Sequence, residues 1–275
     1  MALPAAIRRD APIGVFDSGV GGLTVLRALS EALPSQHFIY LGDTARLPYG
    51  TKSPDTVSRY SLQCAQALLR RGIGALVVAC NTASASALGA LSARYPDLPI
   101  IGVIEPGAQA AIEASQSQHI AVIATEGTIN GGAYQSEIRR RNPAVRVLAR
   151  ACSMFVALAE EGWTSGPVAE AVAHRYLDPV FAADDAPDTL VLGCTHFPIL
   201  TAAIREVIPP PVRIVDSAAT TAQTLVARMA PEPGRQRAPG RITWLATDDA
   251  ERFARVGGRF FGQALSAAAV EVIDL

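Results

Sequence analysis

Two cysteines in this chain each stand directly after a short apolar run and directly before a segment with helical spacing. The first run, Ala75 to Ala79, leads into Cys80-Asn81-Thr82. The second, Thr189 to Leu192, leads into Gly193-Cys194-Thr195-His196, and Pro198 can then begin a helix. Such runs are typical of buried strands in a parallel sheet, where ligand sites gather at the carboxyl ends of the strands. The pattern therefore predicts an α/β protein with a thiol at two strand ends.

The position of these thiols favours chemistry. Free backbone N–H groups at the start of a helix favour negative charge, so we expect both sulfurs to form thiolate more readily than a free cysteine, whose pKa is about 8.5. Ordinary core packing is the alternative for any cysteine that ends an apolar strand. We interpret Cys64 and Cys152 as such structural residues. All four cysteines are expected to be reduced, because the chain shows no secretory signal.

The sequence also repeats itself on a larger scale. A strand over Ile13 to Phe16 ends at Asp17, and a strand over Ile120 to Ala124 ends at Thr125. Each is followed, after a similar length of chain, by one of the two cysteine strands. We expect two pseudo-symmetric three-layer αβα lobes with largely parallel sheets and the active site in the cleft between them. The predicted division is 1–104 plus 216–275 for the first lobe and 105–215 for the second.

Apolar spacing gives the remaining elements. Further strands are predicted over 38–41, 100–104, 145–148, 213–215, 242–245 and 270–273. Helices are predicted over 56–71, 82–95, 133–140, 152–162, 166–182 and 248–261. The strand pattern restarts at Glu105-Pro106-Gly107, and the segment 231–240, rich in proline and glycine, is expected to be a solvated connector.

Composition narrows the class of protein. A chain of 275 residues with 49% hydrophobic and 18% charged residues is expected to bury a substantial core. With a net charge of −1, the chain lacks the excess of positive charge that is typical of proteins that bind nucleic acid or an anionic membrane. Small molecules are therefore the expected partners. The first ten residues lack the apolar core of a secretory signal, and no apolar stretch reaches membrane-spanning length. We therefore expect a cytoplasmic location.

Cofactor and metal sites are not expected. Lys52 is the only lysine and lies in a loop of glycine, proline and serine, whereas pyridoxal phosphate chemistry requires a Schiff-base lysine. The glycines after Asp17 are too closely spaced for the dinucleotide-binding fingerprint. A metal site built from Cys80, Cys194 and His196 has no supporting CxxC or HxxxH spacing.

Two facing thiols suit racemisation or epimerisation beside a carboxylate. One thiolate takes the α-proton from one face, and the other thiol donates a proton to the opposite face. Asp17 and His196 can hold protons near the sulfurs. Small polar side chains with their backbone amides can hold carboxylates without a basic clamp, namely Ser18, Asn81, Thr82, Thr125, Thr128 and Thr195. A thiol hydrolase would use one cysteine with a histidine base, which would leave the second thiol unexplained.

An ordered set of motifs then carries a resemblance. The motifs are Asp17-Ser18-Gly19-Val20-Gly21-Gly22, Pro48-Tyr49-Gly50, Cys80-Asn81-Thr82-Ala83, Glu105-Pro106-Gly107, Ala124-Thr125-Glu126-Gly127-Thr128 and Gly193-Cys194-Thr195-His196-Phe197. Together they resemble the glutamate racemases of the aspartate/glutamate racemase superfamily, in order and from Ile13 to about Ser217. The resemblance implies cofactor-independent interconversion of L- and D-glutamate for peptidoglycan precursors.

The resemblance also implies residue roles. Cys80 and Cys194 match the paired acid/base residues, Cys80 acting on the D-enantiomer and Cys194 on the L-enantiomer. Asp17, His196 and Glu160 match supporting groups, although the adjacent Glu161 leaves the last assignment open. The matching substrate-binding positions are Asp17, Ser18, Pro48, Tyr49, Gly50, Asn81, Thr82, Thr125, Thr128, Thr195 and His196.

Several alternatives stay open at this point. An aspartate or other amino-acid racemase of the same superfamily, or a binding or regulatory protein that keeps the cleft without the chemistry, would share much of the pattern. The resemblance allows a homodimer. It also allows an interaction with DNA gyrase, which nothing in this sequence supports.

Overall fold

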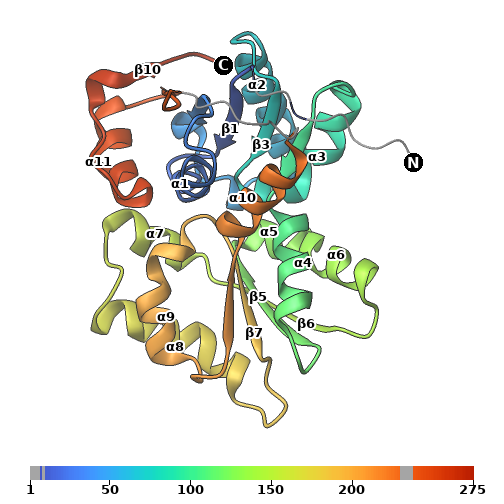
Figure 1. Ribbon diagram of the computed structural model, residues 1–275. Coiled ribbons are helices and arrows are strands. Elements are labelled where there is room, and N and C mark those ends of the chain that lie inside the picture. The colour runs from blue at the N-terminus through green and yellow to red at the C-terminus, as the bar shows by residue number, and fades with distance from the viewer. Residues whose placement is uncertain (1–6, 8–9, 230–237) are drawn as a thin grey trace.

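The protein, seen in a computed structural model that describes residue 7, residues 10–229 and residues 238–275, contains two parallel β-sheets. Helices cover both faces of each sheet, so that the chain forms an upper and a lower αβα unit in Figure 1. The predicted fold class is confirmed: every strand pair within these sheets is parallel.

The first sheet has the strand order β10-β9-β2-β1-β3-β4. Its strands are β1 (Ile13–Asp17), β2 (Phe38–Gly42), β3 (Ala75–Val78), β4 (Ile100–Gly102), β9 (Ile242–Ala246) and β10 (Val270–Val272). One face packs against α1 (Leu23–Ala32), α10 (Ser217–Arg228) and α11 (Ala250–Phe261). The other packs against α2 (Pro54–Leu69) and α3 (Asn81–Arg94). Short 3-10 turns are η1 (Thr44–Arg46), η2 (Tyr49–Thr51) and η4 (Ala267–Ala269).

The second sheet has the strand order β6-β5-β7-β8. Its strands are β5 (His119–Ala124), β6 (Arg146–Ala151), β7 (Thr189–Gly193) and β8 (Arg213–Asp216). One face packs against α4 (Ile104–Ala114) and α6 (Ala133–Arg141). The other packs against α7 (Met154–Glu161), α8 (Pro167–Phe181) and α9 (Thr201–Val207). The short elements α5 (Glu126–Asn130) and η3 (Phe197–Leu200) complete this unit.

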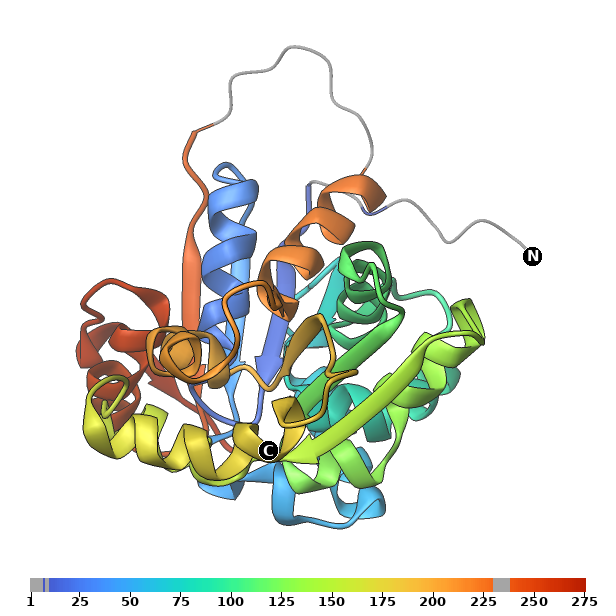
Figure 2. The same cartoon turned by 90° about the horizontal axis from the view of Figure 1, so that it is seen from below.

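The two sheets share one strand order. The run β2-β1-β3-β4 in the first sheet corresponds to β6-β5-β7-β8 in the second. Consequently β1 is equivalent to β5 and β3 to β7, and Cys80 and Cys194 follow equivalent strands. The tail strands β9 and β10 extend the first sheet beyond β2. Seen from below in Figure 2, the tail helix α11 lies beside α7 of the second unit.

Two sequence predictions are wrong at element ends. The strand predicted over 100–104 stops at Gly102, and the unpredicted helix α4 begins at Ile104. Pro106 does not interrupt α4 because it lies in the first turn, where its missing N–H has no intrahelical partner to lose. Pro198 begins no helix: it is the second residue of the 3-10 turn η3, and the following α9 is a separate short helix.

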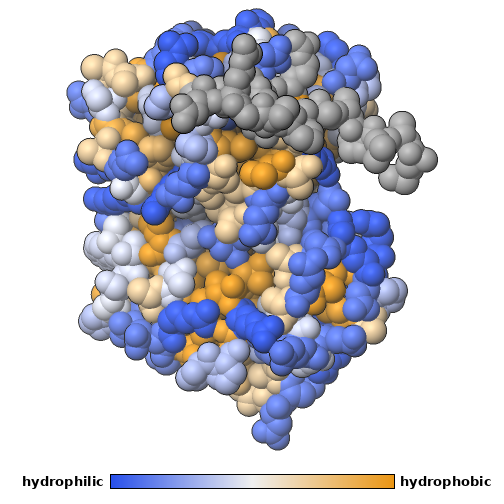
Figure 3. All heavy atoms as spheres, in the orientation of Figure 1, coloured by the Kyte–Doolittle hydropathy of each residue, from blue (hydrophilic) through white to orange (hydrophobic). Residues whose placement is uncertain are grey.

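Polar side chains dominate the outline of the face in Figure 3, while apolar side chains gather in the middle of its lower half. Of the connector predicted over 231–240, residues 231–237 lie outside the described residues, as do 1–6 and 8–9 of the N-terminal segment. Among the residues that the structure describes, no helix has both the length and the apolar character needed to cross a membrane.

Candidate active site

Cys80 occupies the N-cap of α3, two residues after the end of β3. Its sulfur accepts a hydrogen bond from the backbone N–H of Ala83 at 3.4 Å and donates one to Oγ of Ser18 at 3.7 Å. The side chain is 5% exposed. Burial first, and then the negative charge of Asp17, raise the pKa of Cys80 to about 12. The expectation of an easier thiolate is therefore wrong for Cys80, because desolvation outweighs the helix N-terminus.

Cys194 lies in a different environment at the end of β7. No α-helix begins beside it, since η3 starts only at Phe197. Its neighbour is His196, whose Nδ1 lies 3.9 Å from the sulfur. The side chain is 5% exposed, the same fraction as that of Cys80. The imidazole of His196 is thus the side-chain partner of the Cys194 sulfur.

His196 links Cys194 to Glu160. Nε2 of its ring lies 3.3 Å from Oε1 of Glu160. Burial alone would lower the pKa of His196, but its hydrogen bonds with Cys194 and Glu160 outweigh burial and raise the pKa to about 10. The hydrogen bond from His196, against the opposing effect of burial, lowers the pKa of Glu160, and Arg252 contributes in the same direction. The neighbouring Glu161 is exposed, so Glu160 is the carboxylate that the structure places beside His196.

Asp17 lies at the end of β1 and is fully buried. Its carboxylate accepts hydrogen bonds from the N–H of Gly19 at 3.0 Å and from the hydroxyl of Thr195 at 3.4 Å. Burial raises the pKa of Asp17, although the charge of His196 and nearby backbone N–H groups oppose the rise. Gly21 permits this arrangement, because a Cβ there would lie 2.4 Å from Nδ1 of His196.

Several hydrogen bonds close the cleft by joining the two units. Thr24 donates to the carbonyl of Thr195 at 3.1 Å, and the hydroxyl of Thr82 lies 3.0 Å from that of Thr125. Thr128 completes this hydroxyl cluster, at 3.1 Å from Thr82. Polar side chains that follow the strands of both sheets thus contact one another between the two units.

Asn81 is held across the cleft by Tyr134. The Tyr134 hydroxyl, on α6, donates to Oδ1 of Asn81 at 2.8 Å. Nδ2 of Asn81 is buried and has no hydrogen-bond partner among the described residues. A buried unpaired donor is costly, and a ligand oxygen would satisfy it. Tyr134 was not predicted from the sequence, which offers no signal for a residue that acts through its partner.

Three predicted substrate-binding residues come from the loop around η2. Pro48 and Gly50 line a pocket of about 260 Å³ together with Thr125 and Glu160. The Tyr49 side chain instead lies in the core, where its hydroxyl donates to Asp43. Only the backbone of Tyr49 can therefore face a ligand in this arrangement.

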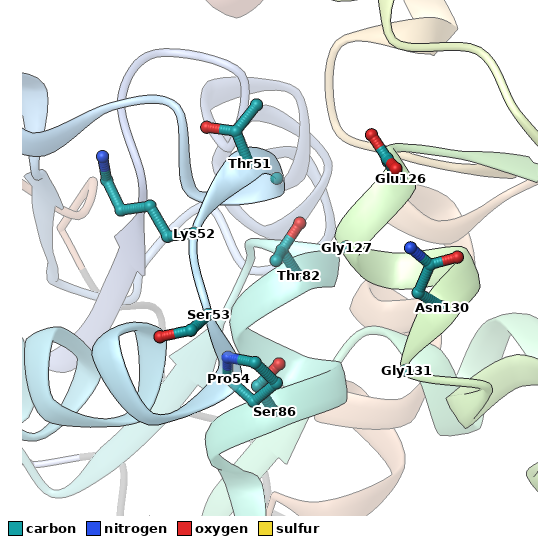
Figure 4. Close-up of a pocket in the computed structure, with 11 residues that line it drawn as sticks. Thr51, Lys52, Ser53, Pro54, Thr82, Ser86, Glu126, Gly127, Asn130 and Gly131 are labelled. Atoms are coloured by element: carbon teal, nitrogen blue, oxygen red, sulfur yellow. The ribbon is translucent and has the colours of Figure 1, made fainter.

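A second pocket, of about 430 Å³, lies where this loop meets α5. Figure 4 shows Thr51, Lys52 and Ser53 on one side, Glu126 and Asn130 on the other, and Thr82 of α3 between them. Thr82 thus belongs both to the hydroxyl cluster and to the wall of this pocket. Within the described part of the chain, no group of three or more histidine, cysteine or acidic side chains is arranged to hold a metal ion.

Comparison with known proteins decides the family. The model of the Asp/Glu/Hydantoin racemase family matches residues 13–225, a span that includes both cysteines. The chain belongs to this racemase family. As a member of it, the protein is an enzyme that acts as an isomerase. The resemblance found in the sequence motifs is thereby confirmed.

Individual relatives of this racemase are similar over almost its whole length. The glutamate racemase of Geobacter metallireducens is 52% identical over 254 residues, covering 91% of this chain and 92% of the relative. The crystal structure of glutamate racemase from Francisella tularensis in complex with D-glutamate is similar with a TM-score of 0.87 and 33% identity, covering 97% and 98% of the two chains. The crystal structure of glutamate racemase from Thermus thermophilus in complex with β-chloro-D-alanine is similar with a TM-score of 0.82 and 42% identity. The match covers 96% of this chain and 97% of that one.

Proposed function

We propose that this racemase interconverts L- and D-glutamate by two-base proton transfer between Cys80 and Cys194. The observation that carries the proposal is the position of the two cysteines at equivalent strand ends of two sheets, whose following segments contact each other. The negative charge of a Cys194 thiolate contributes to the raised pKa of Cys80, so the two sulfurs lie within electrostatic reach of each other. Two-base racemisation needs an acid and a base on opposite faces of one carbon.

The polar lining supports a substrate with two carboxylates. The unpaired Nδ2 of Asn81 can donate to one carboxylate oxygen, and the hydroxyls of Thr82, Thr125 and Thr128 can donate to another. In the present arrangement these hydroxyls bond one another at 3.0–3.1 Å. A carboxylate would replace those neutral contacts with stronger charge-assisted ones.

The different surroundings of Cys80 and Cys194 suggest an order for the proton transfers. In the L-to-D direction, Cys194 as thiolate takes the α-proton, and the Cys80 thiol donates its own proton to the opposite face. The reaction then leaves Cys194 as thiol and Cys80 as thiolate, and the reverse reaction restores the first state. The raised pKa of Cys80 supports a resting thiol at that position, while protonated His196 would stabilise a thiolate at Cys194.

The proposal includes a cofactor-free mechanism. The only lysine, Lys52, lines the outer pocket with Thr51 and Ser53 rather than joining the cysteines. The supply of D-glutamate for peptidoglycan synthesis is the accompanying biological role, supported by the resemblance to glutamate racemases. A homodimer remains a prediction.

The test is enantiomer formation from single amino acids. The purified protein is incubated separately with L-glutamate, D-glutamate and L-aspartate, and products are resolved by chiral chromatography. We expect both glutamate enantiomers to give the racemate and aspartate to remain unchanged. Racemisation of aspartate alone would favour the aspartate racemase alternative, and no turnover of any amino acid would favour a binding protein.

A further inference from the structure

The tail helix α11 reaches across the cleft to the proton-transfer machinery of the second unit. Arg252 on α11 contacts Oε2 of Glu160 on α7 at 2.9 Å. The other oxygen of the same carboxylate lies 3.3 Å from His196, which in turn lies 3.9 Å from the sulfur of Cys194. Figure 1 shows α11 directly above α7. One chain of contacts therefore joins the tail of the first unit to Cys194.

The position of Arg252 is unfavourable for its own helix. α11 begins at Ala250, so the guanidinium lies in the first turn, where the helix dipole disfavours positive charge. The backbone N–H of Arg252 is capped by Asp249 at 2.9 Å, which fixes the residue at the helix start. An arginine at this point thus contributes little to helix stability, and its ion pair with Glu160 accounts for its placement.

A second arginine fixes the distance between the helices. Arg259, farther along α11, donates to the backbone carbonyl of Glu160 at 3.1 Å. It packs against Gly162, the left-handed residue that ends α7, where a Cβ would lie 2.6 Å from the guanidinium. Two contacts from α11 therefore hold Glu160, one on its side chain and one on its backbone.

We propose that Arg252 is a positioning residue for proton transfer at Cys194, acting through Glu160 and His196. Glu160 shares its two oxygens between a cation from each unit. With Arg252 in place, the carboxylate is anchored and turns Oε1 toward His196. Without it, the half-buried carboxylate can rotate, and the imidazole loses its fixed orientation toward the sulfur. This inference rests on the proposed two-base function.

The role is specific to one of the two thiols. Cys80 contacts Ser18 and Ala83 and lies in the field of Asp17, and this chain of contacts does not pass through Glu160. Arg252 lies beyond residues 13–225, the span of the family model, so the shared motifs do not include it. A loss of Arg252 should therefore affect the step at Cys194 and spare the step at Cys80.

The equilibrium constant of racemisation is one, and this shapes the test. Because of this constant, any variant must change kcat/KM by the same factor for L-glutamate and for D-glutamate. A comparison of the two kcat/KM values therefore cannot show which thiol is affected. The isotope effect from α-deuterated substrate separates the two steps. When the Cys194 step becomes slower, the effect rises for L-glutamate, which Cys194 deprotonates. The isotope effect falls for D-glutamate. There Cys80 removes the deuteron first, and this step approaches equilibrium before the slow proton transfer from Cys194.

The experiment compares Arg252→Gln, Arg252→Lys and the wild type, with Arg255→Gln as matched control. Arg255 is an exposed arginine on the same helix that lines a different pocket, with Gly258 and Gly262. For Arg252→Gln we expect kcat/KM to fall about tenfold in both directions. The isotope effects should diverge between the enantiomers as described. Arg252→Lys should recover part of the rate, and Arg255→Gln should match the wild type.

A double-mutant cycle decides between positioning and general stabilisation. In a Glu160→Gln background, Arg252→Gln should have no further effect on rate or isotope effect. Equal isotope effects for the two enantiomers in Arg252→Gln, or an undiminished loss in the Glu160→Gln background, would overturn the inference. A wild type that fails to racemise glutamate overturns the proposed function and this inference together. A fully active wild type with an unaffected Arg252→Gln overturns this inference alone.

Discussion

The two cysteines occupy equivalent places in equivalent sheets, yet their surroundings differ in charge. Cys80 caps a helix beside a hydroxyl and the carboxylate of Asp17. Cys194 lies beside the imidazole of His196, which is held in turn by Glu160 and Arg252. The repeated backbone places a thiol at an equivalent strand end in each sheet, and the two thiols have unlike neighbours. A two-base reaction needs this difference, because one thiol must be the acid while the other is the base.

Removal of either sulfur is expected to cause the largest loss of racemisation rate. Cys80→Ala and Cys194→Ala should each lower the rate of glutamate racemisation by about 10²- to 10⁴-fold, the usual loss when a general acid or base is removed. The measurement is the initial rate from each enantiomer by chiral chromatography. Cys152→Ala is the control, since Cys152 is also buried between a strand and a helix but directs its thiol to the Arg150 carbonyl. A comparable loss of rate in Cys152→Ala would contradict a special role for Cys80 and Cys194.

The next effect comes from the close approach of the two units. Gly21→Ala would put a Cβ 2.4 Å from Nδ1 of His196 and displace the imidazole from Cys194. We expect a loss of about 10²-fold in kcat, because a displacement near 1 Å at a reacting group has that consequence. Gly89→Ala in α3, where no heavy atom lies within 4 Å of the added Cβ, should leave kcat unchanged. An unaffected Gly21→Ala would show that His196 does not need this position.

The supporting groups should give opposite isotope patterns. Asp17→Asn should slow the step at Cys80, because the charge of Asp17 acts on that thiol, and His196→Gln should slow the step at Cys194, because its contact with the sulfur is lost. We expect each loss to be about 10- to 100-fold. The isotope effect from α-deuterated substrate should rise for D-glutamate in Asp17→Asn and for L-glutamate in His196→Gln. The same pattern in both variants would contradict the assignment of one support to each thiol.

The smallest effect is on stability. The pKa of His196 is raised to about 10, above its unfolded value of about 6.5, so its contribution to folding is fully present below the unfolded value and disappears as the pH rises through 10. The free energy of unfolding, measured with urea between pH 7 and 10.5 (about the range of this titration), should decline more steeply in wild type than in His196→Gln. If the free energy of unfolding declined equally with pH in the two proteins, the contacts of protonated His196 would not stabilise the fold.

How much of this was readable from the sequence depends on the kind of signal. Apolar strands ending in Asp17, Cys80, Thr125 and Cys194 predicted the fold class, because periodicity and strand-end residues are local features. The helix α4 was missed because Pro106 and Gly107 are typical of a turn, although proline is tolerated in a first helical turn.

The site was readable only in part. The motifs named the thiols and Glu160, but desolvation of Cys80 depends on packing from both units and has no local signature. The contacts of Arg252 with Glu160 and of Tyr134 with Asn81 join residues that are distant in the chain. A single sequence contains no pattern that links such pairs.

The central claim is that two different sulfurs act on opposite faces of one carbon, and the position of the solvent label tests it most directly. L-glutamate is converted in D2O to low extent, and both the D-glutamate formed and the L-glutamate that remains are analysed for deuterium at the α-carbon. The account predicts deuterium in the D-glutamate formed and protium in the L-glutamate that remains. Product D-glutamate carrying the substrate's own protium would mean that one base serves both faces, and would contradict the account.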